Sequence, residues 1–388
     1  MRVSVPILAA TLLLGGLGCA GGGSKGTSYP TDTTTIQPGH QLASPARWYD
    51  DAVIYQVWVR AFADGKYDDG IGDLPGILGK LDYLQSLGVD TLWLSPIFEC
   101  AYKGADMHGY DTTDYLAVND LFGQKADLAA LIDAIHGRGM RVLFDFVPNH
   151  TSSSHPWFTG ANAQTWYCWQ PTLPGGWILP WGGGTSASVW LPLGPGYYYY
   201  SAFGSGMADL NYYNPDVCTA MQGVEAYWLD RGFDGMRVDA ARYLCEEGPG
   251  LEADQPDTHA RLQAFRAVLD GYAAPGNAHP HPSADPAQVS TKIMIAEAWT
   301  PDATGVGPYY GNGSNEFNLC LDFSAPWATF NASPRATPPS SPPSGSMKGT
   351  TTRLGTGPPP STPTMTTSFP GLEPSTVATG RPSSWPRL

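Results

Sequence analysis

The chain has 388 residues, 42% of them hydrophobic, which is enough for one large domain and additional segments. Its formal net charge of −14 argues against nucleic acid or an anionic membrane surface as a partner, because both would repel it. A soluble protein with a neutral ligand, such as a sugar, is compatible with these values. The 13 Trp and 20 Tyr suit stacking on sugar rings, but aromatic side chains also fill protein cores.

The first 46 residues predict export. Arg2 precedes an apolar run, Val3 to Leu14, that is too short to span a bilayer, and small residues follow it. Residues 1–19 are therefore interpreted as a signal peptide. The sequence around Cys19 (GCAG) resembles a bacterial lipobox, in which a lipid on Cys19 would be the only membrane contact; an ordinary signal peptide is the alternative. Residues 20–46 form a flexible linker by composition. We expect an extracellular, periplasmic or lipid-anchored protein.

Six cysteines fit an oxidising compartment. If Cys19 carries a lipid, five remain, and an odd number leaves at least one unpaired. Their connectivity cannot be deduced from the sequence, and no CxxC pair indicates a metal or redox site.

From residue 52 onward, the hydrophobic pattern alternates between strand and helix. Apolar runs predict buried strands, and apolar residues three or four apart predict one-sided helices. The expected elements in chain order are a strand at 52–59, a helix from Asp73 to before Gly88, a strand at 91–94, a helix at 128–135, a strand at 142–147, a helix at 217–228, a strand at 235–238, a helix at 262–272, and strands at 292–296 and 317–323.

This alternation indicates a parallel α/β sheet with helical crossovers. An open doubly wound sheet and a closed barrel both remain compatible with it, and about six of the eight strands of a barrel can be counted. Residues 151–213 interrupt the pattern after the third strand with a segment rich in Trp, Gly and Tyr. A loop of this length is usually functional. Its aromatic residues either hold the insert together or provide at least one sugar-stacking surface.

Two carboxylates and an arginine are candidates for chemistry. Arg237 and Asp239 are two apart, so they project from the same face at the end of their predicted strand, and Glu297 ends the following strand. An arginine beside a carboxylate keeps it ionised, as a nucleophile requires. Two carboxyl groups about 5 Å apart across a glycosidic bond give a retaining reaction. The alternative interpretation is a structural ion pair that ties the sheet together.

Several segments resemble, in order and spacing, the signature regions of the α-amylase family of glycoside hydrolases. The segments are GYDTTDY at 109–115, DFVPNH at 145–150, MADLN at 207–211, GFDGMRVDAARY at 232–243 and IAEAW at 295–299. The resemblance covers roughly residues 48–330. It implies a (β/α)8 TIM barrel that is incomplete at its C-terminal end. Its parts would be a first barrel section at 47–150, an inserted subdomain at 151–213 and a second barrel section at 214–330.

The resemblance also implies roles for individual residues. Asp239 would be the nucleophile and Glu297 the acid/base, with Arg237 beside them. The substrate-binding residues it implies are Tyr110, which would stack under the sugar, His150, which would donate to its hydroxyl, Asp145, which would support the site, and Arg242 and Tyr243, which stand where many amylases have Lys-His.

The expected function is hydrolysis of α-1,4-glucosidic bonds in starch-like glucans or maltooligosaccharides. Two alternatives remain open. One is an α-glucosidase or glucan transferase of the same family, and the other is a surface maltodextrin-binding lipoprotein without catalysis.

Calcium is the expected cofactor. The resemblance implies Asn149 and Asp209 as ligands. A second candidate is the loop 64–73, where Asp69, the Ile71 carbonyl and Asp73 keep the alternate spacing of oxygen ligands, while Asp64 is one residue out of step. A plain solvated Asp/Gly turn is the alternative for this loop.

Residues 331–388 differ from the rest, being rich in Pro, Ser, Thr and Gly with almost no apolar periodicity. The resemblance ends here without the family's Asn-His-Asp segment, which supplies a third carboxylate. A stalk is one interpretation; we favour a shifted reading frame. Codons for Pro363 to Thr366 read one base earlier give NAC-NAT-GAC, which permits Asn-His and requires Asp. We expect the chain as written to be poorly stable and weakly active, because an unclosed barrel has exposed sheet edges.

Overall fold

The structure is a computed structural model that describes residues 47–66, 68–194, 196–273, 292–300 and 303–323. The chain divides into two units, Met1–Phe330 (with Leu388) and Asn331–Arg387, and every described residue belongs to the first. The predicted signal peptide, the linker and the tail at 331–388 lie outside the described residues, so these predictions stand untested.

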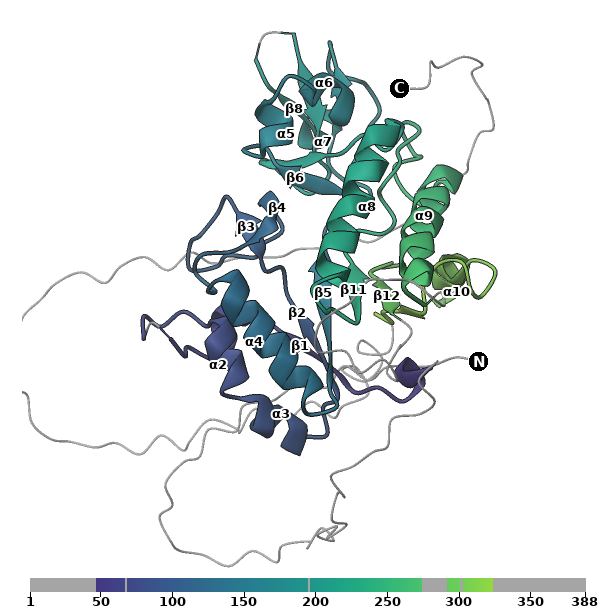
Figure 1. The fold of residues 1–388 in the computed structure, drawn as a ribbon. Coiled ribbons are helices and arrows are strands. Elements are labelled where there is room, and N and C mark those ends of the chain that lie inside the picture. The colour runs from purple at the N-terminus through teal and green to yellow at the C-terminus, as the bar shows by residue number, and fades with distance from the viewer. Residues whose placement is uncertain (1–46, 67, 195, 274–291, 301–302, 324–388) are drawn as a thin grey trace, which may run out of the picture. The chain divides into compact units, whose positions relative to one another are not determined.

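A parallel sheet forms the centre of the described unit (Figure 1). Its strands are, in spatial order, β1 (Ile54–Val57), β2 (Thr91–Leu94), β5 (Arg141–Phe146), β11 (Gly235–Val238), β12 (Ile293–Ala296) and β13 (Leu319–Cys320). This order follows the chain without reversal. A doubly wound sheet would reverse direction from its first strand, so the arrangement is that of a barrel built progressively around one axis. The six described strands make an incomplete TIM barrel, as expected.

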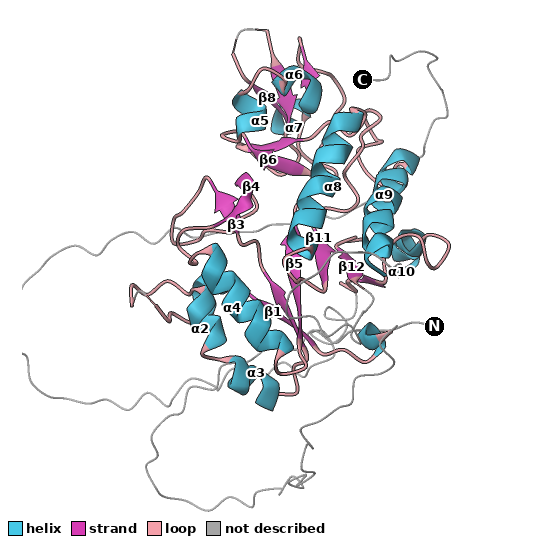
Figure 2. Ribbon diagram, in the orientation of Figure 1, coloured by secondary structure: helices cyan, strands magenta, loops and turns pink. Residues whose placement is uncertain are grey.

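Helices cover the outer side of this sheet (Figure 2). They are α2 (Leu74–Leu78), α3 (Leu81–Ser86), α4 (Lys125–His136), α8 (Pro215–Leu229) and α9 (Pro256–Ala273), with the short elements α1 (Val59–Phe62), α10 (Ala303–Val306) and η3 (Gly307–Tyr310). The short turn η1 (Trp48–Asp50) instead packs Trp48 against inward-facing side chains of the sheet. The single helix predicted from Asp73 to before Gly88 is in fact two, because α2 ends at Leu78 and Lys80 is non-helical. The last strand was expected at 317–323 but pairs only over Leu319–Cys320.

Alternation along the strands divides the core into two layers. Side chains such as Leu92, Phe144 and Val238 point outward and pack with the helices in the main hydrophobic cluster. Trp93, Leu143 and Ile295 point inward and form a smaller cluster with Trp48. Because successive residues of a strand face opposite sides, any polar residue in phase with the inner set lies inside the barrel.

One glycine is required by the sheet itself. Gly235 begins β11 with φ of +150°, and a Cβ there would lie 2.1 Å from the backbone oxygen of Ile293 on β12. Glycine therefore permits the two strands that carry the candidate carboxylates to approach each other.

The insert has its own small core. Strand β6 (His150–Ser152) pairs antiparallel with β10 (Met207–Asp209), and a second sheet has the order β7-β9-β8. The elements of this second region are α5 (Pro156–Thr159), α6 (Ala163–Trp166), β7 (Trp169–Gln170), α7 (Ser186–Val189), β8 (Trp190–Pro192) and β9 (Tyr198–Tyr200). Trp177, Trp190 and Tyr200 pack together at its centre, so these three aromatics hold the insert together. Sequence periodicity also missed the hairpin of β3 (Phe98–Cys100) and β4 (Thr112–Val118).

Cysteine pairing and membrane spans are testable only within the described ranges. The five cysteines there are Cys100, Cys168, Cys218, Cys245 and Cys320, and all are free and buried. No helix in these ranges is long and apolar enough to cross a bilayer.

Candidate active site

Arg237 lies at the centre of a polar group inside the barrel. It is in phase with the inner face of β11 and stands in register with Asp145 on β5. Its guanidinium contacts three carboxylates: one Nη1 bond to Asp145 at 2.5 Å, a second to Asp239 at 3.0 Å, and an Nη2 bond to Glu297 at 2.7 Å. The arginine is only 4% exposed, so these contacts form where water screens them little.

Asp239 and Glu297 lie at the carboxyl ends of adjacent strands. The hydrogen-bond ladder continues through both residues, because the Asp239 amide donates to Phe146 and the Glu297 amide to Val238. The next residue, Ala240, adopts φ of 51°, a strained conformation for a residue with a side chain. That turn directs the Ala240 amide to Glu297 Oε2 at 3.3 Å. The two carboxylates contact different nitrogens of one guanidinium and therefore lie side by side.

Asp145 is also held by hydrogen bonds from two aromatic side chains. The indole of Trp93, on the inner face of β2, donates to Asp145 Oδ2 at 3.1 Å, and the hydroxyl of Tyr110 donates to the same oxygen at 3.3 Å. Tyr110 in turn accepts from Arg237 Nη1 at 3.2 Å. The sequence-predicted residues Tyr110, Asp145, Arg237, Asp239 and Glu297 are thus brought together.

The electrostatics of this group are dominated by burial and by an excess of carboxylates. Burial raises the pKa of Asp145 to about 6 despite the favourable charge of Arg237. Burial also raises the pKa of Asp239 well above its usual range, with further contributions from the charges of Glu297 and Asp145. One guanidinium cannot neutralise three carboxylates. Burial and the neighbouring negative charges thus favour the protonated forms of Asp145 and Asp239 and oppose the effect of Arg237.

His150 lies near this group and packs against an aromatic side chain. Its ring is 1% exposed and packs on Phe203 at 5.1 Å, and its Nε2 has no hydrogen-bond partner in the described structure. Burial lowers the pKa of His150 to about 3, so the ring is neutral. Phe203 also contacts Tyr243 and Trp181, and the latter is 45% exposed. Trp181 is thus an accessible aromatic of the insert, in contact with the ring that covers His150.

Arg242 is engaged within the protein. Its Nε donates to Asp254 Oδ1 at 2.8 Å, its Nη2 to Asp254 Oδ2 at 2.5 Å, and its Nη1 to the carbonyl oxygen of Trp299. The Tyr309 hydroxyl donates to Asp254 as well. Arg242 follows Asp239 by three residues and Trp299 follows Glu297 by two, so this cluster ties together the two segments that carry the candidate carboxylates.

The predicted calcium pair forms a direct contact. Asn149 Nδ2 donates to Asp209 Oδ1 at 2.6 Å, and the Ala202 amide donates to Asp209 Oδ2 at 2.9 Å. Asn149 Oδ1 is buried with no partner among the described residues, and burial raises the pKa of Asp209 to about 7. One free oxygen suits a hard cation. However, no three His, Cys, Asp or Glu side chains of the described part converge as a metal site.

The loop at 64–73 satisfies its own carboxylates. Asp73 accepts from the Gly76, Gly65 and Lys66 amides at 2.6–3.1 Å, and it caps helix α2. Asp64 accepts from the amides of Asp68 and Gly70, and Asp69 accepts from the Ile71 amide. In this arrangement the carboxylates could bind a calcium ion only if they gave up their hydrogen bonds to these backbone amides. A calcium ion in this loop therefore stays a prediction.

Sequence reasoning missed Trp93, Asp254 and Tyr309. Trp93 could have been found from the two-residue alternation of β2, which places it on the inner face. It pairs with Leu143, two residues before Asp145 on β5. Asp254 and Tyr309 carry no such signal, since loops of no regular period bring them to Arg242.

An incomplete parallel barrel, with carboxylates gathered where its strands end, defines the class of barrel enzymes that work at the carboxyl edge of the sheet. The chain belongs to the α-amylase family of glycoside hydrolases, because the family model "Alpha amylase, catalytic domain" matches residues 56–340.

Among curated proteins, the chain is 35% identical over 312 residues to an α-glucosidase of Apis mellifera, covering 71% of this chain and 51% of the relative. It is 38% identical over 205 residues to an oligo-1,6-glucosidase of Halalkalibacterium halodurans, covering 51% and 36%. A solved α-amylase from H. orenii superposes with a TM-score of 0.57 at 32% identity, covering 72% of this chain and 53% of that one. The chain thus spans about half, or less, of the length of these relatives.

Proposed function

We propose that this site cleaves α-glucosidic bonds with retention of configuration, using Asp239 as nucleophile and Glu297 as acid/base. The observation that carries the proposal is the shared guanidinium: Arg237 contacts both carboxylates within 3.0 Å, which supports the short separation that a retaining pair requires. The expected substrates are α-1,4-linked starch-like glucans or maltooligosaccharides. A neutral substrate suits the acidic chain.

The reaction proceeds in two displacements. An Asp239 oxygen attacks the anomeric carbon as the glycosidic C–O bond breaks, and Glu297 transfers its proton to the leaving oxygen. Glu297 then takes a proton from water, whose oxygen attacks the same carbon and breaks the glycosyl ester. Two inversions give net retention.

The surrounding residues have supporting roles in this proposal. Tyr110 presents its ring beside the carboxylates, and the unpaired Nε2 of neutral His150 would donate to a sugar hydroxyl. Asp145 and Trp93 hold Arg237 in place. Tyr243 contributes packing against Phe203 and Trp181.

Hydrolysis of maltoheptaose by the purified protein tests the proposal, with Glu297→Gln and Asp239→Asn as matched variants. Glu297→Gln should lower kcat by about 10²–10⁴-fold, the usual contribution of a general acid. Asp239→Asn should lower it at least as much while leaving sugar binding intact. Early product should be the α-anomer by NMR. Undiminished turnover in Asp239→Asn, or a β-anomeric product, would contradict the assignment.

A second candidate is an α-glucosidase or glucosyl transferase with the same chemistry. The names of the Apis and Halalkalibacterium relatives favour it, and so does the engagement of Arg242 by Asp254, which removes that side chain from the substrate. Product analysis on maltoheptaose separates the two. An endo-acting hydrolase gives several mid-length products, an α-glucosidase releases glucose stepwise, and a transferase gives chains longer than the substrate.

A non-catalytic maltodextrin-binding protein is the remaining rival. It predicts maltoheptaose binding without turnover, and equal binding by the parent and by Asp239→Asn. Calcium is proposed only as a structural ion near Asn149 and Asp209, because one buried Asn149 oxygen is unpaired there.

A further inference from the structure

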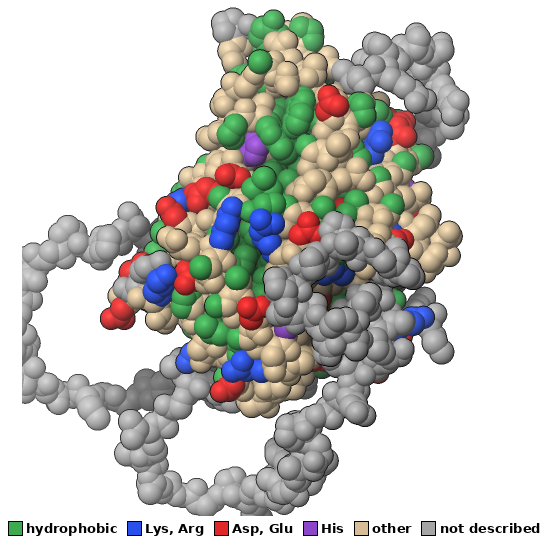
Figure 3. Space-filling view, viewed as in Figure 1, with side chains coloured by type: hydrophobic (Ala, Val, Ile, Leu, Met, Phe, Trp, Pro, Cys, Tyr) green, Lys and Arg blue, Asp and Glu red, His purple; other side chains and the backbone are tan. Residues whose placement is uncertain are grey.

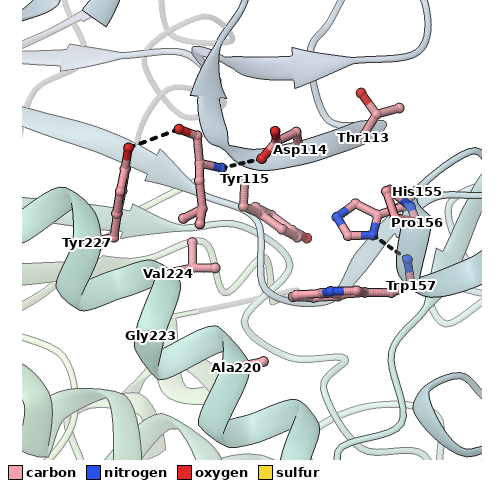
Figure 4. A pocket seen from close by; sticks show the side chains of 11 residues that line it. Thr113, Asp114, Tyr115, His155, Pro156, Trp157, Ala220, Gly223, Val224 and Tyr227 are labelled. Atoms are coloured by element: carbon pink, nitrogen blue, oxygen red, sulfur yellow. Dashed lines mark hydrogen bonds between the residues drawn. The ribbon is translucent and has the colours of Figure 1, made fainter. Parts of the chain in front are cut away.

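A cavity lies between helix α8, strand β4 and the start of α5, on the outer side of the barrel (Figure 4). Its volume is about 490 Å³, within the usual range for small-ligand sites. On the same face, Figure 3 shows hydrophobic side chains gathered beside α8. None of the lining residues belongs to the candidate active site.

Aromatic and small residues shape this cavity. Trp157 is partly buried and packs on the rings of His155 at 4.5 Å and Tyr115 at 5.8 Å, which hold its indole plane in position. Figure 4 shows these rings facing the α8 side chains Val224 and Tyr227 across the space. Such an arrangement offers an aromatic surface beside an apolar wall.

The floor of the cavity is unusually open because α8 carries Gly223 there. A Cβ built on Gly223 would meet no atom within 4 Å. Glycine inside a helix costs about 1 kcal/mol relative to alanine, and neither the backbone conformation nor packing requires it at this position. The missing side chain therefore contributes free space to the cavity.

His155 provides a directed hydrogen-bond donor. Its Nδ1 accepts from the Trp157 amide at 3.0 Å, so the proton of the neutral ring is on Nε2. Burial lowers the pKa of His155 to about 4, which keeps the ring neutral near pH 7. Figure 4 shows its other nitrogen directed to the cavity, where it has no partner among the described residues. His155 is only 4% exposed.

Asp114 provides acceptors on the same rim. One of its oxygens accepts from the Leu116 amide at 2.8 Å, and the residue is exposed. Asp114 and His155 line the same cavity. The Thr113 hydroxyl adds a group that both donates and accepts. The cavity thus combines an aromatic surface, a neutral donor and a carboxylate acceptor.

We propose that this cavity is a second carbohydrate-binding site that holds one or two glucose units of an α-glucan away from the active site. A pyranose ring presents apolar C–H groups on its faces and hydroxyls at its edge, which matches an indole surface with a donor and an acceptor beside it. The identity of the sugar rests on the proposed function. The site would hold a long substrate on the enzyme between cleavages.

The test uses the full chain carrying Asp239→Asn, so that maltoheptaose is bound but not cleaved. Gly223→Leu places a side chain in the open floor and should favour the helix, and Gly223→Ala is the matched control. Calorimetry with maltoheptaose should find two sites in the Asp239→Asn and Gly223→Ala proteins. Gly223→Leu should lose one site, with its affinity reduced at least about tenfold.

The outcomes are distinguishable from those for the proposed function. In the otherwise unchanged enzyme, Gly223→Leu should leave turnover of a chromogenic maltotrioside unaltered while slowing degradation of insoluble starch. Loss of one binding site upon Gly223→Leu supports the second site even if the parent shows no turnover. Identical binding by the Gly223→Leu and Gly223→Ala proteins overturns it, whether or not the enzyme is active.

Discussion

At the scale of single residues, Arg242 occupies a position where the resemblance implied contact with sugar, yet its hydrogen bonds go to Asp254 and Trp299. This geometry makes it a positioning residue for Glu297. Arg242→Lys cannot reproduce the bidentate contact. We expect kcat to fall about tenfold with KM nearly unchanged, measured on a short chromogenic maltooligosaccharide.

Asp254→Asn serves as the comparison for that variant, because it keeps one acceptor for Arg242. Its loss of kcat should be smaller. A raised KM at constant kcat in Arg242→Lys would instead mean that Arg242 binds the substrate directly.

His155 should make the fold sensitive to acid. Burial lowers its pKa to about 4, compared with about 6.5 for a free histidine. Below pH 6.5 the unfolded state therefore binds more protons, and stability falls as the pH drops towards 4. The contribution is on the order of 3 kcal/mol at full protonation. Urea unfolding at pH 7 and pH 4.5 measures it.

His155→Gln retains an acceptor for the Trp157 amide and does not titrate. Its unfolding free energy should change less between the two pH values than that of the parent. Equal pH dependence in the two proteins would show that other groups control acid unfolding.

At the scale of elements, Asp73 organises the first turn of α2 and the loop before it. Asp73→Ala removes a helix cap and two further acceptors for backbone amides. We expect a loss of about 2–4 kcal/mol in unfolding free energy. Asp73→Asn retains one acceptor oxygen and should lose less.

The same variants test calcium in this loop. If the loop binds the ion, Ca²⁺ added after EDTA treatment should raise the Tm of the parent and not that of Asp73→Ala. Equal Tm shifts in both proteins would mean that calcium binds outside this loop. No Tm shift in either protein would mean that calcium does not stabilise this protein.

At the scale of the whole molecule, closure of the barrel decides whether the sheet has exposed edges. Among the described strands, β1 and β13 each pair with one neighbour only, and two more strands would be needed for eight. Unpaired edges favour association between chains. If no other part of the chain pairs with these two edges, the chain should associate with itself, and size-exclusion chromatography would detect the larger species.

Sequencing the gene across codons 325–370 is the matching control. A shifted frame that encodes further strands and an Asn-His-Asp segment should yield a more soluble and more active protein. Stop codons in that frame, or robust activity of the present chain, would refute the frameshift interpretation.

The sequence by itself determined the alternation of strands and helices and the family, because strand burial and signature motifs are local properties. It also placed Asp239 and Glu297 at strand ends, since two-residue periodicity decides which side of a strand a residue faces. Only the tertiary structure decided that one guanidinium contacts three carboxylates, that Arg242 is held by Asp254, and that Asp73 also accepts from the amides of Gly65 and Lys66. Those outcomes depend on which loops meet in space, and loop contacts leave no period in the sequence.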